Sequence, residues 1–167
     1  RAPDTGKMPT ALLAAIAGQL VAHTESPSDG FAAVWEGWGA LFGGSLRFGW
    51  RSDGTTFSEQ SPAILPADVD AGPRLGLPGR DHVLFSAAPA AFADPHWVLD
   101  APWRDRPSEA AGFAPSARHP ALLWPKDHAW VLVSEIDFDS TVIGGSAELI
   151  AALCAERWIE ALPLPPN

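Results

Sequence analysis

The chain has 167 residues and a mass of 17.7 kDa, close to the size of one domain with a single hydrophobic core. Its hydrophobic fraction of 47% and charged fraction of 19% are typical of a folded protein and not of a disordered one. Eleven basic residues against twenty acidic ones give a formal charge of −9, which disfavours contact with nucleic acid and with anionic membranes. We therefore expect no nucleic-acid partner and no membrane partner.

Cysteine content and the start of the chain bear on its compartment. The single cysteine, Cys154, excludes an internal disulfide and a four-thiolate zinc site, so we expect a reducing, cytoplasmic environment. The longest apolar run near the start, residues 11–17, falls far short of the roughly 20 residues that span a bilayer. The chain opens at Arg1 and not at a methionine, which is typical of a fragment or a trimmed chain.

The first elements are predicted from apolar spacing and turn residues. Residues 8–23 carry leucine, isoleucine and valine at helical spacing on an alanine-rich background, which predicts an amphipathic helix. Turn-forming residues follow at 26–30, and the apolar run 31–36 predicts a half-buried strand. The dense glycines of residues 37–49 indicate a bent strand or a bulged hairpin.

The middle of the chain is interrupted by proline. Four prolines and four glycines in residues 52–79 argue against a continuous helix or central strand, so we expect a long loop. Residues 83–85 predict a buried strand, and residues 89–92 predict one helical turn that stops at Asp94. Residues 100–120 hold four more prolines and are expected to form a second irregular stretch, which either serves the function or wraps a sheet edge.

The last third gives the clearest elements. Residues 129–138 combine β-branched and aromatic side chains without glycine or proline, which predicts the central strand. A short strand at 142–143 is expected to return beside it, followed by a helix over 146–158 with Ser146 as its N-cap. The buried stripe of this helix is expected to consist of Leu149, Ile150, Leu153 and Cys154.

These elements together predict an α+β fold. We expect a single domain over residues 1–167, with a mostly antiparallel sheet flanked by an N-terminal and a C-terminal helix. Long loops rich in proline and glycine connect the elements, and no internal repeat of solenoid length is present.

Three carboxylates recur at alternate positions of the predicted central strand. Because the side chains of a strand alternate between its faces, Glu135, Asp137 and Asp139 are expected to share one face. Such a row can hold Mg²⁺ or Ca²⁺, or pair an acid with an ionised carboxylate for proton transfer. Alternatively, the acids leave the core where the strand exits, and Asp139 caps the next turn. We predict no metal centre and keep the three acids as candidate binding residues.

Other reactive side chains form no known motif. The histidines are scattered, without a His-x-x-x-His pair on a predicted helix, which disfavours zinc. The Asp-His pairs at 81–82 and 127–128 place neighbouring side chains on opposite faces of an extended chain, and no Gly-x-Ser-x-Gly motif offers a serine. Cys154 is expected to be a small buried thiol. The glycines at 144–145 lack the lysine of a phosphate loop, so we predict no catalytic residue and no cofactor.

Tryptophan is the unusual residue, with eight in a chain that has no tyrosine. Aromatic side chains in loops often anchor binding surfaces. One of the eight lies between two glycines and three lie close to prolines, so we expect these four to be exposed binding residues: Trp38, Trp97, Trp103 and Trp124. The alternative is that loop tryptophans fasten the long loops onto the core.

Several short motifs carry a resemblance. They are VWEGWG at 34–39, LPGRD at 77–81 and LWPKDHAW at 123–130, followed by EID at 135–137, ST at 140–141 and GGS at 144–146. With these motifs the chain resembles, over about residues 20–165, a family of uncharacterised actinobacterial proteins. The resemblance implies no activity.

Two functions from different classes remain. The first is a non-enzymatic interaction module, similar to a bacterial immunity or regulatory protein, which binds a basic protein partner through its tryptophan-bearing loops. The second is a metal-assisted or carboxylate-dependent hydrolase that uses the acidic row. Alternate strand positions lie about 6.5–7 Å apart, too far for three carboxylates to reach one ion without a bend. We therefore rank the interaction module first and the enzyme second.

Overall fold

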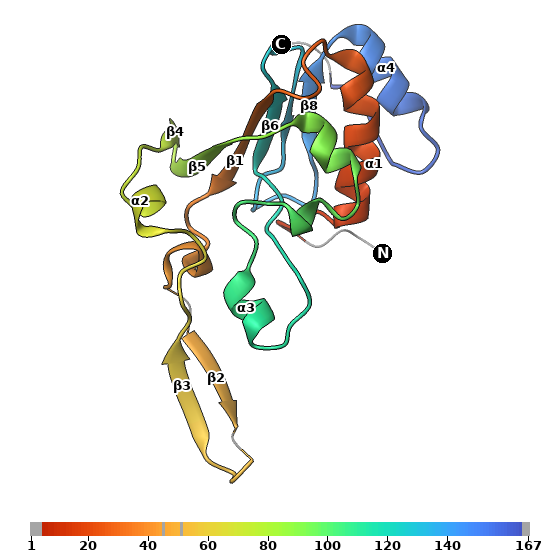
Figure 1. Ribbon diagram of the computed structural model, residues 1–167. Helices are drawn as coiled ribbons and strands as arrows, with labels where there is room; N and C mark the ends of the chain where they lie inside the picture. The colour runs from red at the N-terminus through yellow and green to blue at the C-terminus, as the bar shows by residue number, and fades with distance from the viewer. Residues whose placement is uncertain (1–4, 45, 51, 165–167) are drawn as a thin grey trace. The chain divides into compact units, whose positions relative to one another are not determined.

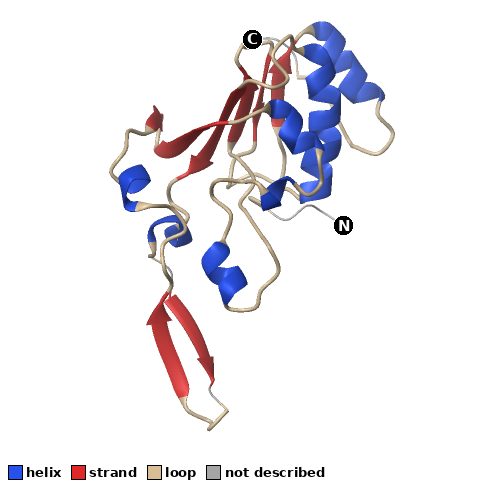
Figure 2. Ribbon diagram, viewed as in Figure 1, coloured by secondary structure: helices blue, strands red, loops and turns tan. Residues whose placement is uncertain are grey.

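The computed structural model describes residues 5–44, 46–50 and 52–164 (Figure 1). Internal contacts divide the chain into two compact units. Unit 1 comprises Arg1–Val34, Leu84–Trp97 and His119–Asn167, and unit 2 comprises Trp35–Val83 and Val98–Arg118. Both contain helices and antiparallel strands, so the expected α+β class is confirmed (Figure 2). The single domain expected over the whole chain stays a prediction.

A six-stranded sheet has the strand order β4-β5-β1-β6-β7-β8. Its strands are β4 (Leu75–Leu77), β5 (Arg80–Ser86), β1 (Gly30–Trp35), β6 (Leu122–Pro125), β7 (Trp130–Val133) and β8 (Val142–Gly145). The pairs β4–β5, β1–β6, β6–β7 and β7–β8 are antiparallel. Strands β1 and β5 each carry the chain from one unit into the other.

Helices cover one face of the sheet in unit 1. They are α1 (Thr10–Leu20), continued by the 3-10 turn η1 (Val21–His23), the 3-10 turn η3 (Pro89–Ala93) and α4 (Ala147–Ala155) (Figure 1). The apolar side chains between these helices and the strands are buried: Leu13, Leu20, Val34, Leu123, Trp130, Leu132, Leu149 and Leu153. Removal of these side chains from water is the main force that holds unit 1 together.

Unit 2 is built from short elements. They are η2 (Gly39–Phe42), β2 (Leu46–Trp50), β3 (Thr56–Gln60), α2 (Ala67–Asp70) and α3 (Arg106–Ala110), and the 3-10 turn η4 (Trp97–Leu99) leads into its second segment. Strands β2 and β3 pair with each other as a separate two-stranded sheet. The largest buried side chains of the unit are Leu41 and Trp103. Among the described helices of the whole chain, none has the length and apolarity needed to cross a bilayer.

The helices near the two ends of the chain largely agree with those predicted from the sequence. The helix expected over 8–23 is α1 with η1, and the single helical turn expected over 89–92 is the 3-10 turn η3. Ser146 is the N-cap of α4, because its Oγ accepts a hydrogen bond from the N–H of Leu149 at 3.2 Å. The helix nevertheless ends at Ala155, and Cys154 is exposed, so the buried thiol expected there is wrong.

Several expectations about strands and loops are wrong. Residues 129–138 do not form a central strand: β7 ends at Val133 and lies next to the sheet edge formed by β8. Trp130 and Leu132 of β7 are buried, but Ile136 in the following connection is only half-buried. The loop expected over 52–79 contains β3, α2 and β4, and the stretch 100–120 contains α3, whose N-cap is an aspartate. Strand pairing, which the sequence does not display, decides these boundaries.

Candidate functional site

The two faces of the sheet in unit 1 differ in burial. The strand register places Ala32, Leu123 and Leu132 side by side on one face, and all three are fully buried. A Cβ at Gly145 would lie 2.7 Å from Cδ2 of Leu149, so this face looks toward α4. The opposite face carries apolar side chains that are partly or largely exposed, and we call it the open sheet face: Phe31, Leu122, Trp124, Val131, Val133 and Val142.

An aromatic pair forms the centre of the open sheet face. Phe31 of β1 lies opposite Trp124 of β6 in the register, and their rings stack with centroids 5.5 Å apart at an interplanar angle of 30°. Val131 of β7 and Gly144 of β8 continue the same row across the sheet. Because Gly144 has no side chain, the row ends in a hollow beside Val131.

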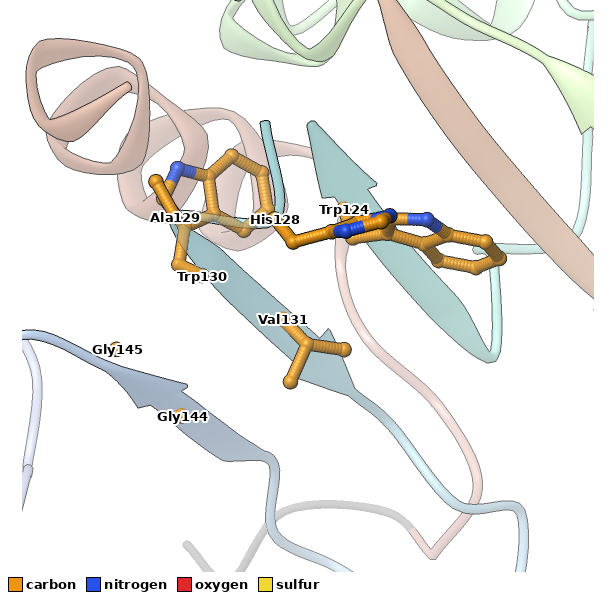
Figure 3. Close-up of a pocket in the computed structure, with 7 residues that line it drawn as sticks. All are labelled: Trp124, His128, Ala129, Trp130, Val131, Gly144 and Gly145. Atoms are coloured by element: carbon orange, nitrogen blue, oxygen red, sulfur yellow. The ribbon is translucent and has the colours of Figure 1, made fainter. Parts of the chain in front are cut away.

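This hollow is an open cavity of about 400 Å³. It is lined by Trp124, His128, Ala129, Trp130, Val131, Gly144 and Gly145. Figure 3 shows Trp124 and His128 on one side of the cavity and the two glycines of β8 on the other. Among the described residues of this lining, His128 is the only one with an ionisable side chain.

A tight turn between β6 and β7 positions His128. Its φ of 55° is left-handed, a conformation that non-glycine residues adopt at a cost of about 1 kcal/mol. Asp127 holds the turn: its Oδ1 accepts from the N–H of Ala129 at 3.1 Å, and its Oδ2 accepts from the N–H of Glu25 at 2.7 Å and the hydroxyl of Thr24 at 2.8 Å. Desolvation raises the pKa of Asp127, but these hydrogen bonds together outweigh it and leave the pKa below its ordinary value.

Carboxylates flank the open sheet face at the β6–β7 turn. Asp127 lies in this turn, and Lys126 donates to Oδ2 of Asp29 at 2.8 Å, which raises the pKa of the lysine. The side chains of Lys126 and Asp29 are 66% and 58% exposed, so this ion pair adds little to stability.

Unit 2 has a smaller cavity of about 250 Å³. It is lined by Trp38, Ala40, Leu41, Ile64, Trp103, Asp105, Ser116, Ala117 and Arg118. The guanidinium of Arg118 lies 3.9 Å from the ring centroid of Trp38, a cation–π contact. Asp105 is occupied as the N-cap of α3, because its carboxylate accepts from both the N–H and the hydroxyl of Ser108. The cavity therefore lies where residues 103–118 pack against the segment around η2.

The four candidate tryptophans separate into exposed and buried ones. Trp124 lines the first cavity and Trp38 the second, and both are partly exposed. Trp97 and Trp103 are 4% and 1% exposed, so the expectation that they lie at the surface is wrong. Trp97 packs against Phe92 at 5.2 Å, and the indole N–H of Trp103 donates to the carbonyl of Arg118 at 2.7 Å. These two side chains fasten loops to the core, which was the alternative interpretation.

The acidic row does not share a strand face. Glu135, Asp137 and Asp139 lie in the connection between β7 and β8, so the expectation of one shared strand face is wrong. Oε1 of Glu135 accepts a hydrogen bond from the N–H of Ile136 at 2.7 Å, and the two aspartates are exposed. Within the described residues, no group of three histidine, cysteine or acidic side chains is placed to hold a metal ion. The row supplies negative charge at this end of the sheet.

Three residues of these surfaces were not among the binding residues predicted from the sequence. Phe31 and His128 belong to the open sheet face and its cavity, and Trp50 is 81% exposed on β2. The alternation of apolar side chains at positions 46, 48 and 50 is a strand signal that the glycines around it obscured. Comparison of the chain with known protein families, with curated proteins and with solved structures found no match.

Proposed function

We propose that this chain is a non-enzymatic protein-interaction module, and that the open sheet face of unit 1 binds a basic segment of a partner protein. The observation that carries the proposal is the stacked pair Phe31 and Trp124 beside a cavity of about 400 Å³. Interfaces are anchored by large aromatic side chains next to pockets that a partner side chain can fill. A bacterial immunity or regulatory protein acts in this way, through a surface that neutralises a cationic partner.

Charge selects the class of partner. Unit 1 holds four of the eleven basic residues of the chain and eleven of its twenty acidic ones, so seven of the nine excess negative charges belong to it. Acidic side chains lie at both ends of the open sheet face: Asp127 and Asp29, of which Asp29 is paired with Lys126, near the β6–β7 turn, and Glu135, Asp137 and Asp139 in the β7–β8 connection. Such a field attracts lysine and arginine and repels anionic ligands.

The edge strand β8 suits an extended partner segment. It is the last strand in the sheet order, and its residues Val142, Gly144 and Gly145 are exposed. An extended peptide can add a strand to such an edge and place alternate side chains on the open sheet face. The lone cysteine fits a reducing compartment, so we place this binding in the cytoplasm. The resemblance to the actinobacterial family stays part of the proposal and adds no activity to it.

Selection from a library of random displayed peptides tests the proposal. We expect selected peptides to combine lysine or arginine with apolar residues, and their affinity to fall as salt is raised. Trp124→Ser should weaken binding at least tenfold, because it removes the aromatic anchor. The matched control is Trp158→Ser, since Trp158 is also in unit 1, is 47% exposed and belongs to none of the strands of the open sheet face.

A charge pair of variants separates the surface from the fold. Val142 is 50% exposed on the open sheet face, so its replacement leaves the core intact. Val142→Lys should weaken a basic peptide about fivefold at low salt, and Val142→Glu should strengthen it by a similar factor. Equal effects of the two variants, or selected peptides without basic residues, would contradict the proposal.

A further inference from the structure

A row of large apolar side chains lies exposed on the β2–β3 hairpin. Leu46, Phe48 and Trp50 occupy alternate positions of β2 and therefore share one face of the strand. Their exposed fractions are 59%, 74% and 81%. Opposite them in the antiparallel register stand the polar residues Gln60, Ser58 and Thr56. We call this side the apolar face of the hairpin.

The other face of the hairpin is closed by its own residues. A Cβ at Gly49 would lie 2.6 Å from Cε1 of Phe57, so the phenyl ring of Phe57 covers the backbone of β2 there. Phe57 is half-buried as a result, in contrast to the three side chains of the apolar face. Glycine at position 49 thus allows the cross-strand ring contact. One face of the hairpin is thus partly covered by the ring of Phe57, while the side chains of the apolar face are exposed.

A two-stranded hairpin with an exposed apolar face gains little stability from its own contacts. Two-stranded hairpins are marginally stable in water unless a third strand or another surface packs on them. The described part of the chain gives this sheet only the strands β2 and β3, so each strand has an edge without a neighbour. Leu46, Phe48 and Trp50 expose on the order of 400 Å² of apolar surface together, which is as large as the largest patch of a typical monomer.

Charge indicates which occupant fits. Residues 46–60 contain two arginines, one aspartate and one glutamate, so the segment is formally neutral in a chain of charge −9. A basic partner is attracted to the acidic surface of unit 1 and gains nothing here from electrostatics. Two copies of a neutral apolar face, in contrast, meet without repulsion between their hairpins. A two-fold axis brings the same patch of each copy into contact, and an extended two-stranded ribbon is self-complementary in this way.

We propose that the β2–β3 hairpin is a dimerisation arm, whose apolar face packs against the same face of a second copy of this chain. Two such faces bury on the order of 800 Å² of side-chain surface, and the flanking backbone brings the interface toward the lower limit of about 1,200 Å² for specific complexes. Because interfaces at this lower limit belong mostly to weak complexes, we expect a reversible dimer. The proposal is independent of the function proposed for unit 1.

Sedimentation velocity and light scattering on the full chain test the dimer. The mass is expected to rise from 17.7 kDa to twice that value as the concentration increases from about 1 to about 100 µM. The double variant Phe48→Ser/Trp50→Ser should stay monomeric over this range with an unchanged circular dichroism spectrum. The matched control is Phe113→Ser, because Phe113 is 67% exposed in unit 2 outside the hairpin. This control should dimerise like the wild type.

Cysteine cross-linking tests which face of the hairpin makes the contact. Ser58 stands opposite Phe48 on the apolar face, while the next residue, Glu59, points to the other face, and both are exposed. In a Cys154→Ser background, mild oxidation should give a covalent dimer of Ser58→Cys and far less of Glu59→Cys. A monomer at every concentration, a dimer that survives the double variant, or equal cross-linking of the two cysteines overturns the proposal. Loss of basic-peptide binding by the double variant, without any dimer in the wild type, assigns the hairpin to the partner and also overturns it.

Discussion

Trp130 gives the sharpest test of how unit 1 is held together. Its side chain is 2% exposed between the sheet and the helices, and β7 places it beside Leu132 on the covered face. A tryptophan buries up to about 250 Å², so truncation to alanine removes on the order of 150–200 Å² of buried apolar surface. At about 25 cal/mol per Å² this corresponds to roughly 4–5 kcal/mol of lost transfer free energy.

The indole N–H of Trp130 reduces this cost. Within the described residues, Nε1 of Trp130 is buried without a hydrogen-bond partner. A buried donor without a partner costs about 1–3 kcal/mol, which its removal restores. We therefore expect Trp130→Ala to lower the free energy of unfolding by about 3 kcal/mol. Trp130→Phe should cost about 1 kcal/mol or less, because it keeps most of the ring and removes the N–H.

Urea unfolding followed by far-ultraviolet circular dichroism measures both values. The matched control is Trp50→Ala, because Trp50 is 81% exposed and its loss should change stability by less than about 0.5 kcal/mol. The control is measured at a concentration at which the protein is monomeric. A Trp130→Ala variant no less stable than Trp50→Ala would refute the buried position. A Trp130→Phe variant as unstable as Trp130→Ala would refute the argument about the N–H.

Two further predictions concern the helix cap and the β6–β7 turn. Ser146→Ala removes the hydroxyl that accepts from the N–H of Leu149, so α4 should lose about 1 kcal/mol in urea unfolding, whereas Ser146→Asp should keep the cap. Asp127 has a lowered pKa in the folded state because hydrogen bonds, including those from Ala129 and Thr24, favour its ionised form. Its contribution is therefore present above pH 3.8, the ordinary value, and is lost as the pH falls through the lower folded value. Between pH 5 and about 2, the melting temperature of Asp127→Asn should therefore fall less than that of the wild type. An equal fall in both proteins would contradict this role of Asp127.

Features that depend on local sequence were predictable from it. The apolar spacing of residues 8–23 predicts α1 and η1, and the serine before residues 147–155 predicts the cap of α4. In each case the signal lies within a few residues of the feature, because helix periodicity and N-capping are local interactions. The class of the fold followed from such elements.

Features that depend on pairing were not predictable from one sequence. The β-forming composition continues to residue 138, but β7 ends at Val133 because its register with β8 begins there, at Val142. The acidic row then falls in a connection, which removes the spacing argument for a metal site. Likewise, proline beside Trp103 predicts a surface loop, but the indole is buried and its N–H donates to the carbonyl of Arg118, 15 residues further along the chain. A neighbour distant in sequence decided each outcome.

The two proposed surfaces use different units, which predicts that their variants act independently. The open sheet face lies in unit 1, which holds eleven acidic and four basic residues, whereas the apolar face of the hairpin lies in unit 2 within a formally neutral segment. Trp124→Ser should therefore lower the affinity for basic peptides at least tenfold and change the dissociation constant of the dimer by no more than about twofold. Phe48→Ser/Trp50→Ser should weaken the dimer and leave the affinity for basic peptides within about twofold. Salt should separate the two surfaces as well, because screening weakens the charged contact with the peptide and leaves the apolar contact of the dimer largely unchanged.

The dissociation constant of the peptide is measured by titration and that of the dimer by sedimentation. Both are measured for Trp124→Ser, for Phe48→Ser/Trp50→Ser and for the variant that combines them. Additive effects in the combined variant support two separate surfaces. A combined effect that differs from the sum of the separate effects by more than about 0.5 kcal/mol would mean that one surface serves both partners.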